Sequence, residues 1–370
     1  MESLLHVGSG TLGDVPPDLV VPQPIEPGST VAVMSPSWAV PEEYPAVHEQ
    51  ALQRLRDVLG LTPVEYASTR RSASPQERAR DLMTAFADPD VGAILATIGG
   101  EDQITVLRHL DPDVVLANPT RFLGYSDNTN LLNWLWFHGI AGFHGGSTQV
   151  YLGPGPEVHP DHLTSLRAAL FGGEVVITEA AEFSEDEVGW SVPRALTDPP
   201  RTRPAPPWSW YHADQAVTGP TWGGNLEILG WTLAVGRWVR PVDAYRGCAL
   251  LLETSEERPS ATEVYRTLRN MGERGLLEQA AAVVVARARA SGHTDPVTGR
   301  RGPSDEERDR YRADQEVAVL RALDRYAPGV PVCVGVDFGH TTPQWVLPYG
   351  GSLTVDGPGR RLVARYGATS

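Results

Sequence analysis

The sequence predicts an α/β protein, with a doubly wound, mainly parallel sheet in the N-terminal half and a smaller α/β domain after it. Short apolar runs alternate with segments of helical periodicity, which is the pattern of β-α-β units. Some of these runs, such as residues 91–98, are apolar throughout, as strands buried on both faces of a parallel sheet are. The length of 370 residues suits two domains.

The N-terminal half begins with a Pro- and Gly-rich segment, residues 1–30, which we expect to form an arm. An α/β domain is expected over residues 31–178. One helix start is well marked, because Ser74, Pro75 and Glu77 form the sequence of a capping box with proline at the first position. The other elements expected in this domain are strands at 31–34, 91–98, 121–124 and 142–144, and helices around 52–59, 103–110 and 128–138.

Residues 179–221 interrupt this alternation. The segment is first acidic, then rich in proline and tryptophan, and so is expected to be a connecting or substrate-covering loop. A C-terminal domain is expected over residues 222–370. Its expected elements are helices at 224–235, 261–276 and 305–326, and strands at 249–252, 281–286, 332–336 and near residues 346 and 353.

Composition excludes several classes of protein. A net charge of −15 and a pI near 5.1 argue against binding of a nucleic-acid polymer. No stretch approaches the length of a membrane span, and residues 1–14 lack the pattern of a signal peptide, so we expect a cytoplasmic protein. Cys248 and Cys333 lie inside apolar runs and are expected to be buried thiols. Without a cysteine pair or a His-x-x-x-His spacing, no metal site and no cofactor are expected.

A serine follows a buried run in the segment Gly124-Tyr125-Ser126-Asp127. A strand-to-helix turn at this point would project the Ser126 hydroxyl out of the backbone, as a nucleophile requires. A serine hydroxyl also needs a neighbouring base. All 31 basic residues are arginine, so a Ser-Lys dyad, Schiff-base chemistry and a P-loop are excluded. The base must be histidine or a carboxylate, which points to a Ser-His-acid hydrolase.

Two residues are best placed to complete such a triad. Of the ten histidines, His340 follows a predicted buried strand in a turn-forming segment. Glu253 ends the apolar run at residues 249–252, where a carboxylate faces a cleft rather than the core. Two alternatives stay open at this point. His340 would then be a structural hydrogen-bonding residue, and Glu253 a solvated loop residue beside Glu256 and Glu257.

Five motifs together resemble the LD-carboxypeptidase serine peptidase family over about residues 30–350. In chain order they are Ile98-Gly99-Gly100, Gly124-Tyr125-Ser126-Asp127, Gly223-Gly224-Asn225-Leu226, Leu251-Leu252-Glu253 and Phe338-Gly339-His340-Thr341-Thr342-Pro343. The resemblance implies that the active site lies at the boundary of two α/β domains. Ser126 is the implied nucleophile, His340 the general base and Glu253 the acid that orients it.

The resemblance also implies an oxyanion hole made by the backbone N–H groups of Gly100 and Asp127. It places Gly99 and Asn225 at the substrate and implies a homodimer. By contrast, Glu101 and Asp102 directly follow the glycine pair, and would repel an anionic substrate group if they faced the cleft.

The family contains muramoyl-tetrapeptide LD-carboxypeptidases and microcin C self-immunity peptidases, and this chain resembles the second branch more closely. Its segment 179–221 is similar to the loop with which those enzymes cover the nucleotide end of their substrate. Trp190, Trp208 or Trp210 would stack on a base there, or would merely pack the loop against the domains. The expected substrate is a small peptide or a peptidyl- or aminoacyl-nucleotide.

Three other functions remain as alternatives. The first is a cytoplasmic muramoyl-tetrapeptide LD-carboxypeptidase of cell-wall recycling, and the second is a catalytically silent small-molecule-binding protein. The third is a phosphate or dinucleotide site at Gly99-Gly100, which is weaker because no G-x-G-x-x-G follows the strand. The sequence does not single out one of the 31 arginines as the ligand of a substrate carboxylate.

Overall fold

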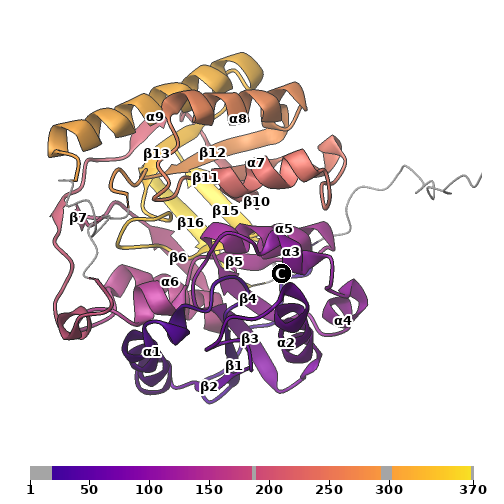
Figure 1. Ribbon diagram of the computed structural model, residues 1–370. Coiled ribbons are helices and arrows are strands. Elements are labelled where there is room, and N and C mark those ends of the chain that lie inside the picture. Colours follow the sequence, from indigo (N-terminus) through magenta and orange to yellow (C-terminus); the bar gives the residue numbers. More distant parts are fainter. Residues whose placement is uncertain (1–18, 186–188, 293–301, 368–370) are drawn as a thin grey trace, which may run out of the picture.

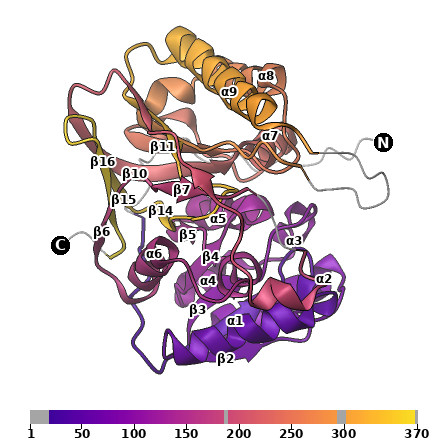
Figure 2. The same ribbon diagram turned by 90° about the vertical axis from the view of Figure 1, so that its left-hand side faces the viewer.

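The computed structural model describes residues 19–185, 189–292 and 302–367. In these residues two sheets rich in parallel strands are covered by helices, and the N-terminal domain lies below the C-terminal domain in Figure 1. Helices α8 and α9 lie side by side on the outer face of the C-terminal domain, as Figures 1 and 2 both show. The predicted α/β class with a doubly wound N-terminal sheet is confirmed.

The N-terminal sheet has the strand order β14-β5-β4-β3-β1-β2, in which β1 to β5 are parallel. The strands are β1 (Thr30–Met34), β2 (Thr62–Glu65), β3 (Val91–Ala96), β4 (Arg121–Gly124), β5 (Gly142–His144) and β14 (Leu347–Tyr349). The winding direction reverses between β1 and β3. In such sheets, ligands bind beyond the carboxyl ends of the strands at the point of reversal.

Six α-helices and three shorter helices belong to this half. The helices are α1 (Pro45–Asp57), α2 (Pro75–Ala87), α3 (Ile104–Leu107), α4 (Pro112–Ala117), α5 (Thr129–Phe137) and α6 (Pro160–Phe171), with 3-10 helices at Val40–Glu42 and Ser126–Asn128 and a π-helix at Thr148–Leu152. The predicted capping box is present, since Ser74 and Glu77 exchange hydrogen bonds at the start of α2. The sequence did not indicate β2, because its partly exposed residues form no continuous apolar run.

The C-terminal sheet has the order β6-β16-β15-β10-β11-β12-β13-β9, with β10 to β13 parallel. The strands are β6 (Glu174–Ile177), β9 (Ser209–Tyr211), β10 (Ala216–Asn225), β11 (Cys248–Glu253), β12 (Ala280–Ala286), β13 (Val332–Val336), β15 (Ser352–Asp356) and β16 (Arg361–Arg365), and β7 (Glu182–Phe183) pairs separately with β8 (Arg203–Pro204). The helices are α7 (Leu226–Val235), α8 (Ala261–Glu273) and α9 (Asp305–Tyr326), with 3-10 helices at Pro193–Leu196, Val242–Tyr245 and Leu277–Gln279.

The two sheets exchange edge strands across the expected domain boundaries. Strand β6, from the first half of the chain, pairs with β16 in the C-terminal sheet. Strand β14, from the second half, pairs with β5 in the N-terminal sheet. Strand β9 and the first half of β10 lie within residues 179–221, so this segment is partly sheet rather than all loop. Of the expected arm, residues 1–18 lie outside the described residues.

Helix α5 joins the two domains and fixes the turn that precedes it. It contacts both α7 and β10. Trp136 is buried on this helix and stacks on Tyr245, with ring centroids 4.9 Å apart. The Trp222 Nε1–H donates to Asn133 Oδ1 at 3.1 Å. Because these contacts cross the boundary, α5 and the turn before it, which carries Ser126, are held in a fixed position relative to the C-terminal domain.

The structure also bears on the expectations about the two cysteines and about membrane spans. Cys248 and Cys333 are buried free thiols, as predicted. Among the helices in the described part of the chain, none has the length and apolar character needed to cross a membrane.

Candidate active site

Ser126 lies on a sharp turn between β4 and α5. Its φ of 60° falls in the left-handed region, which costs energy for a residue other than glycine and is found most often at functional sites. The Ser126 side chain lies against Gly99, at the carboxyl end of β3. A Cβ atom on Gly99 would stand 2.8 Å from Ser126 Cβ and 2.9 Å from its Oγ. Glycine at position 99 therefore leaves the room that the serine side chain occupies.

Asp127 ties this turn to the neighbouring strand ends. Its buried Oδ2 accepts hydrogen bonds from Ser37 Oγ at 2.5 Å and from the Gln103 N–H at 2.9 Å, and Oδ1 accepts from Asn130 Nδ2 at 2.8 Å. Burial raises the pKa of this carboxyl, which these donors partly counteract. Gly100 lies on the other side of Ser37. Its φ is 153°, and a Cβ there would be 2.2 Å from Ser37 Oγ.

The backbone segments that carry Gly100 and Asp127 therefore meet at the hydroxyl of Ser37, close to Ser126. The Asp127 nitrogen would be only 3.1 Å from a Cβ atom on Gly99. An oxyanion hole needs such a pair of backbone donors beside the nucleophile. The assignment of these two N–H groups to an oxyanion stays a prediction.

His340 and Glu253 meet at the carboxyl ends of the C-terminal strands. Glu253 is the last residue of β11, and His340 follows β13. His340 Nδ1 lies 2.6 Å from Glu253 Oε2, and both side chains are buried. The His340 ring also lies 4.8 Å from the ring of Tyr125, which directly precedes Ser126. The structure thus brings the three predicted triad residues to one place at the domain boundary.

The second imidazole nitrogen also faces an acid, since Glu256 Oε2 lies 3.5 Å from His340 Nε2. Burial by itself lowers the pKa of His340, but the charges of Glu253 and Glu256 outweigh burial and raise the pKa to about 9. The resting imidazole is therefore mostly protonated at neutral pH. The sequence analysis named Glu256 only as a neighbour of Glu253 in the chain, whereas the structure places both beside the same ring.

Two further residues adjoin this pair and were not selected from the sequence. His144, at the end of β5, has its Nε2 3.9 Å from Glu253 Oε1, and burial lowers its pKa to about 4, so it is neutral at pH 7. Glu227 accepts hydrogen bonds from Ser255 N at 2.9 Å and from Ser255 Oγ at 2.7 Å. Burial, together with the charge of Glu253, raises the pKa of Glu227 to about 7. Of these two residues, only His144 could have been singled out from the sequence, because it lies at the end of a strand.

A cavity of about 940 Å³ opens at the domain boundary. Ser126 and His340 both line it, together with Gly99, Gly100 and Trp190. The Trp190 ring stands edge-on to Tyr44, with centroids 5.6 Å apart. This volume is at the upper end of the range usual for small-molecule sites, which suits an extended ligand better than a single amino acid.

Three residues expected at the substrate are not part of the cavity lining. Asn225 is buried and caps α7, where its Oδ1 accepts from the Ile228 N–H at 3.0 Å. Trp208 is buried in the hydrophobic core, and its backbone N–H donates to Glu179. Trp210 lies on β9 opposite Cys333 of β13. At these positions all three make contacts within the fold, and of the three tryptophans Trp190 alone is among the described residues that line the cavity. A role of Asn225 at the substrate stays a prediction.

The described residues contain no group of three or more histidine, cysteine or acidic side chains placed to hold a metal ion. The acidic pair after Gly100 is divided between two environments. Asp102 is paired with Arg78 at 2.9 Å, while Glu101 lines the cavity.

Comparison with known families agrees with this geometry. The sequence profile of the LD-carboxypeptidase N-terminal domain matches residues 31–145, and that of the LD-carboxypeptidase C-terminal domain matches residues 218–355. The chain belongs to the LD-carboxypeptidase family. It is accordingly a serine peptidase-like hydrolase, and Ser126 and His340 lie in the two matched domains, one in each.

Relatives of this LD-carboxypeptidase family member fall into two groups. The chain is 26% identical to the microcin C7 self-immunity protein MccF of Escherichia coli, over 77% of each chain. It is 25% identical to a Bacillus subtilis protein described as "Probable murein peptide carboxypeptidase", over 94% of this chain and 95% of the relative.

Solved structures agree in fold. MccF in complex with aspartyl sulfamoyl adenosine superposes with a TM-score of 0.78 at 22% identity, covering 94% of this chain and all of MccF. An MccF-like protein from Streptococcus pneumoniae in complex with AMP gives a TM-score of 0.79 at 23% identity, covering 92% of this chain and all of the relative. At this level of identity the likeness concerns the fold.

Proposed function

We propose that this chain is a serine carboxypeptidase or amidase that hydrolyses an amide bond in a small peptidyl- or aminoacyl-nucleotide, in a role like microcin C self-immunity or detoxification. The observation that carries this proposal is the buried contact between His340 and Glu253 on the wall of the cavity that Ser126 also lines. Activation of a serine hydroxyl for acyl transfer needs a histidine held by a carboxylate, and here such a histidine lines the same cavity as Ser126, whose φ is strained.

In the proposed reaction Ser126 Oγ attacks the carbonyl carbon of the amide. His340 Nε2 takes the hydroxyl proton as the C–O bond forms, and Glu253 holds the Nδ1–H and stabilises the imidazolium. The proton then passes from Nε2 to the leaving nitrogen as the C–N bond breaks. Water, deprotonated by the same nitrogen, releases the acyl group from Ser126 and restores the enzyme.

The N–H groups of Gly100 and Asp127 are proposed to bind the oxyanion of the tetrahedral intermediate. Loss of one donor of this kind typically costs about 100- to 1000-fold in rate. Ser37 supports this assignment, because its hydroxyl lies against Gly100 and hydrogen-bonds to the Asp127 carboxylate.

Trp190 and the size of the cavity favour a nucleotide-bearing substrate. Trp190 is partly buried and lines the cavity, and stacking of a base on its ring would be worth about 1–3 kcal/mol. Relatives of the same fold have been solved with aspartyl sulfamoyl adenosine and with AMP. We extend this ligand class to the present chain as part of the proposal, together with a homodimeric assembly and a cytoplasmic location.

A muramoyl-tetrapeptide LD-carboxypeptidase of cell-wall recycling is the second candidate. It is favoured by the match to the Bacillus subtilis relative, which extends over nearly the whole of both chains. The same cavity has room for a short peptide, and the same three residues would carry out the chemistry.

Mass spectrometry after incubation with two substrates separates the candidates. We expect cleavage of an aminoacyl-sulfamoyl adenosine, with little or no release of D-Ala from a muramoyl tetrapeptide. Ser126→Ala should abolish turnover, and a fluorophosphonate probe should label the wild type at Ser126 alone. Cleavage of the tetrapeptide alone selects the second candidate. Cleavage of neither, or labelling at another serine, contradicts the proposal and favours a silent binding protein.

A pair of tryptophan variants tests the nucleotide part of the proposal. Trp190→Ala should raise KM for the nucleotide substrate by roughly 5- to 150-fold, the equivalent of one lost stack. Trp208→Ala is the matched control. Because Trp208 is buried away from the cavity, this change should lower the melting temperature and leave KM unchanged. An unchanged KM in Trp190→Ala would remove the support for base stacking.

A further inference from the structure

Glu253 uses only one of its two carboxylate oxygens to hold His340. Its Oε2 lies 2.6 Å from His340 Nδ1, whereas its Oε1 is buried and has no hydrogen-bond partner among the residues that the structure describes. A buried carboxylate oxygen without a donor is costly, because the charge has lost its contact with water. The position of Oε1 therefore calls for a second donor.

His144 is the histidine that faces this oxygen. Its Nε2 lies 3.9 Å from Glu253 Oε1, and the side chain is fully buried at the end of β5. Neither of its ring nitrogens has a hydrogen-bond partner on another described residue. The rings of Tyr125 and Phe338 stand edge-on to it, with centroids 6.0 and 5.6 Å away. Two buried polar groups that lack partners thus face each other.

The charge of Glu253 decides which nitrogen of His144 carries the proton. His144 is neutral at pH 7, because burial lowers its pKa to about 4, so one ring nitrogen is an N–H and the other is bare. A proton on Nε2 turns an N–H toward the carboxylate, whereas a bare Nε2 would turn a lone pair toward it and be repelled. A separation of 3.9 Å is longer than a hydrogen bond, and such contacts in active sites often shorten when substrate binds.

A donor on Glu253 Oε1 matters most when His340 is neutral. A charged imidazole compensates the charge of Glu253 by itself. Once that imidazole is neutral, Glu253 is a buried anion, and a second N–H lowers the free energy of this state more than that of the charged pair. His144 would therefore favour the neutral form of His340, which a general base needs, against the opposite effect of Glu253 and Glu256.

We propose that His144 is a positioning residue of the triad, which donates its Nε2–H to Glu253 Oε1 and so holds the carboxylate in place and charged while His340 acts as the base. This inference rests on the proposed hydrolase function and adds one residue to its machinery. His144 acts through Glu253, since it is not among the residues that line the cavity.

Other titratable or charged groups act on the His340–Glu253 pair from four further places in the fold. They lie before α5, on α7, after β11 and on the turn after β12, and they are Tyr125, Glu227, Glu256 and Arg289. Every variant used below keeps all four. A change in the pKa of His340 in such a variant therefore reports on position 144.

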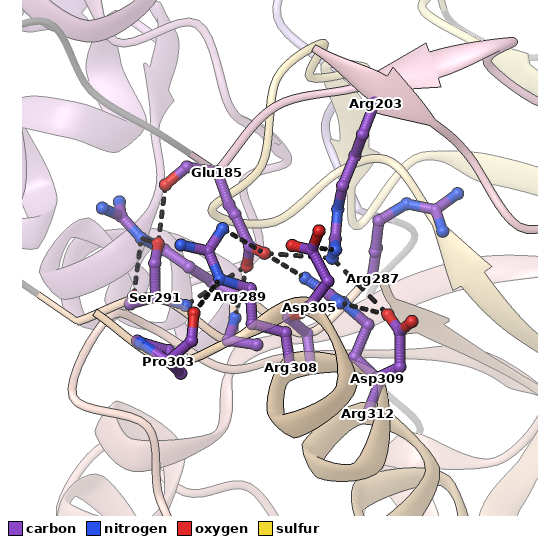
Figure 3. A network of polar contacts seen from close by, with 12 residues as sticks. Glu185, Arg203, Arg287, Arg289, Ser291, Pro303, Asp305, Arg308, Asp309 and Arg312 are labelled. Atoms are coloured by element: carbon purple, nitrogen blue, oxygen red, sulfur yellow. Dashed lines mark hydrogen bonds and ion pairs between the residues drawn. The ribbon is translucent and has the colours of Figure 1, made fainter. Parts of the chain in front are cut away.

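The turn that carries Arg289 has anchors of its own. The backbone N–H groups of Ala290 and Ser291 donate to Glu185 Oε2 at 2.7 and 3.2 Å. Three arginines lie against Glu185 Oε1 at 2.6 to 3.1 Å, as Figure 3 shows: Arg203, Arg308 and Arg312. We call these three and Glu185 the Glu185 cluster. It fixes the positive charge near His340 independently of position 144.

NMR of the wild-type protein with 15N-labelled histidine tests the position of the proton directly. The shifts of a protonated and a bare ring nitrogen differ widely, so the spectrum of His144, assigned through its backbone resonances, tells which nitrogen carries the proton. We expect the proton on Nε2 at pH 8, and a proton on Nδ1 overturns the proposal. This measurement needs no variant, so it decides the question even where a substitution at this buried position prevents folding.

The rate at which a fluorophosphonate labels Ser126 measures the effect on the base. His144→Phe keeps an aromatic ring and removes the N–H, so the pKa that governs labelling should rise by about one unit. Labelling should then be about tenfold slower than in the wild type at pH 8, but less than about twofold slower at pH 10.5, where both proteins hold a mostly neutral His340. A merely structural role would slow labelling equally at both pH values.

Two amide variants form a matched pair at the same position. The side-chain amide of His144→Gln reaches the place of Nε2 and should regain most of the rate at pH 8, whereas that of His144→Asn reaches the place of Nδ1 and should not. His138 serves as the control position, because it is a half-buried histidine at the end of α5 whose pKa is also lowered by burial. His138→Phe keeps a ring beside Trp134 and should label at the wild-type rate at both pH values.

The results separate this inference from the proposed function. A wild-type rate in His144→Phe at pH 8, an equal loss at both pH values, or equal rates in the two amide variants overturns the role of His144, while cleavage of a substrate by the wild type would still support the proposed function. Failure of the wild type to label at Ser126 overturns both.

Discussion

His340 is the residue on which the chemistry of the site depends most directly. One ring nitrogen contacts Glu253 at 2.6 Å and the other faces Glu256 at 3.5 Å. Two carboxylates around one imidazole favour its charged form, yet a general base has to be neutral. If His340 is the general base, as proposed, the resting protein holds it in the inactive, charged form at neutral pH.

We expect kcat/KM to rise with pH toward an apparent pKa of about 9, the pKa of His340. Glu256→Gln removes one of the charges that raise this pKa, so the rising limb should move down by about one pH unit. A pH–rate profile of wild type and variant, with the exposed Glu306→Gln as control, measures this. An unchanged limb in Glu256→Gln would show that Glu256 does not act on His340.

The same pKa has a consequence for stability. An ordinary histidine pKa of 6.5 applies to the unfolded chain, and the value in the folded protein is about 9. The charged imidazole therefore stabilises the fold fully below pH 6.5, and this contribution is lost as the pH rises through 9.

At the scale of single residues, the sequence indicated site residues where a chemically suitable side chain also lies at the end of an apolar run. Ser126, Glu253 and His340 each end or follow an apolar run, and strand ends meet at one edge of a parallel sheet. The position of Glu256 at His340 was not predictable, because it depends on the path of a turn. Trp208 and Trp210 were not distinguishable from Trp190, since composition does not say which aromatic ring is buried.

At the scale of single elements, the turn after β3 is defined by backbone geometry that only glycine adopts easily. Gly100→Ala would place its Cβ 2.2 Å from Ser37 Oγ, so the turn has to shift. We expect this variant to react with the fluorophosphonate probe on the order of 100-fold more slowly, because the backbone donors would be displaced.

Gly173→Ala is the matched control for this experiment. Gly173 also has a positive φ, 118°, but a Cβ there meets nothing within 4 Å. Gly173→Ala therefore introduces a similar backbone strain without a clash, and this variant should react with the fluorophosphonate probe at the wild-type rate. Equal labelling of both variants would argue against an oxyanion hole at Gly100.

The Glu185 cluster joins β8, α9 and the turn after β12. Burial by itself raises the pKa of Glu185, but the arginines, Arg312 foremost, lower it below its ordinary value. Glu185→Gln would leave three guanidinium groups without their shared charge. We expect a loss of about 3–5 kcal/mol in the free energy of unfolding, measured by urea denaturation.

Glu306→Gln, on the exposed face of α9, should change this free energy by less than about 0.5 kcal/mol. A neutral Glu185→Gln would mean that the cluster contributes little to folding. The sequence did not predict the cluster, because Glu185 lies in an acidic stretch that is typical of a solvated loop.

At the scale of the whole molecule, buried contacts join the two domains, and we expect them to unfold as one unit. Tyr349, on β14 of the N-terminal sheet, is fully buried, and its hydroxyl donates to the Gly223 carbonyl of β10 at 3.1 Å. Tyr349→Ala should cost about 3–5 kcal/mol, and Tyr349→Phe about 1 kcal/mol. Urea unfolding followed by tryptophan fluorescence and by far-UV circular dichroism should give one coincident transition in each case. Two separated transitions would contradict a single unit.

The sequence predicted the α/β class and the strands that consist of continuous apolar runs, because such runs are local, but it did not indicate β2, β6, β9, β10 or β16. It did not reveal that β6 and β14 change sheets. A short strand is compatible with either sheet on its own residues, and only the tertiary fold decides its partner.

Strand β14 is synthesised much later than β5, the strand with which it pairs. During synthesis Ser126 and β4, the strand before it, leave the ribosome long before residue 349, yet β5 keeps an open edge until that point. Exposed edges of this kind pair readily with other chains. A product of premature termination would contain Ser126, the proposed nucleophile, but would lack His340 and the strand that covers the edge of β5, and we expect it to be degraded by proteolytic quality control.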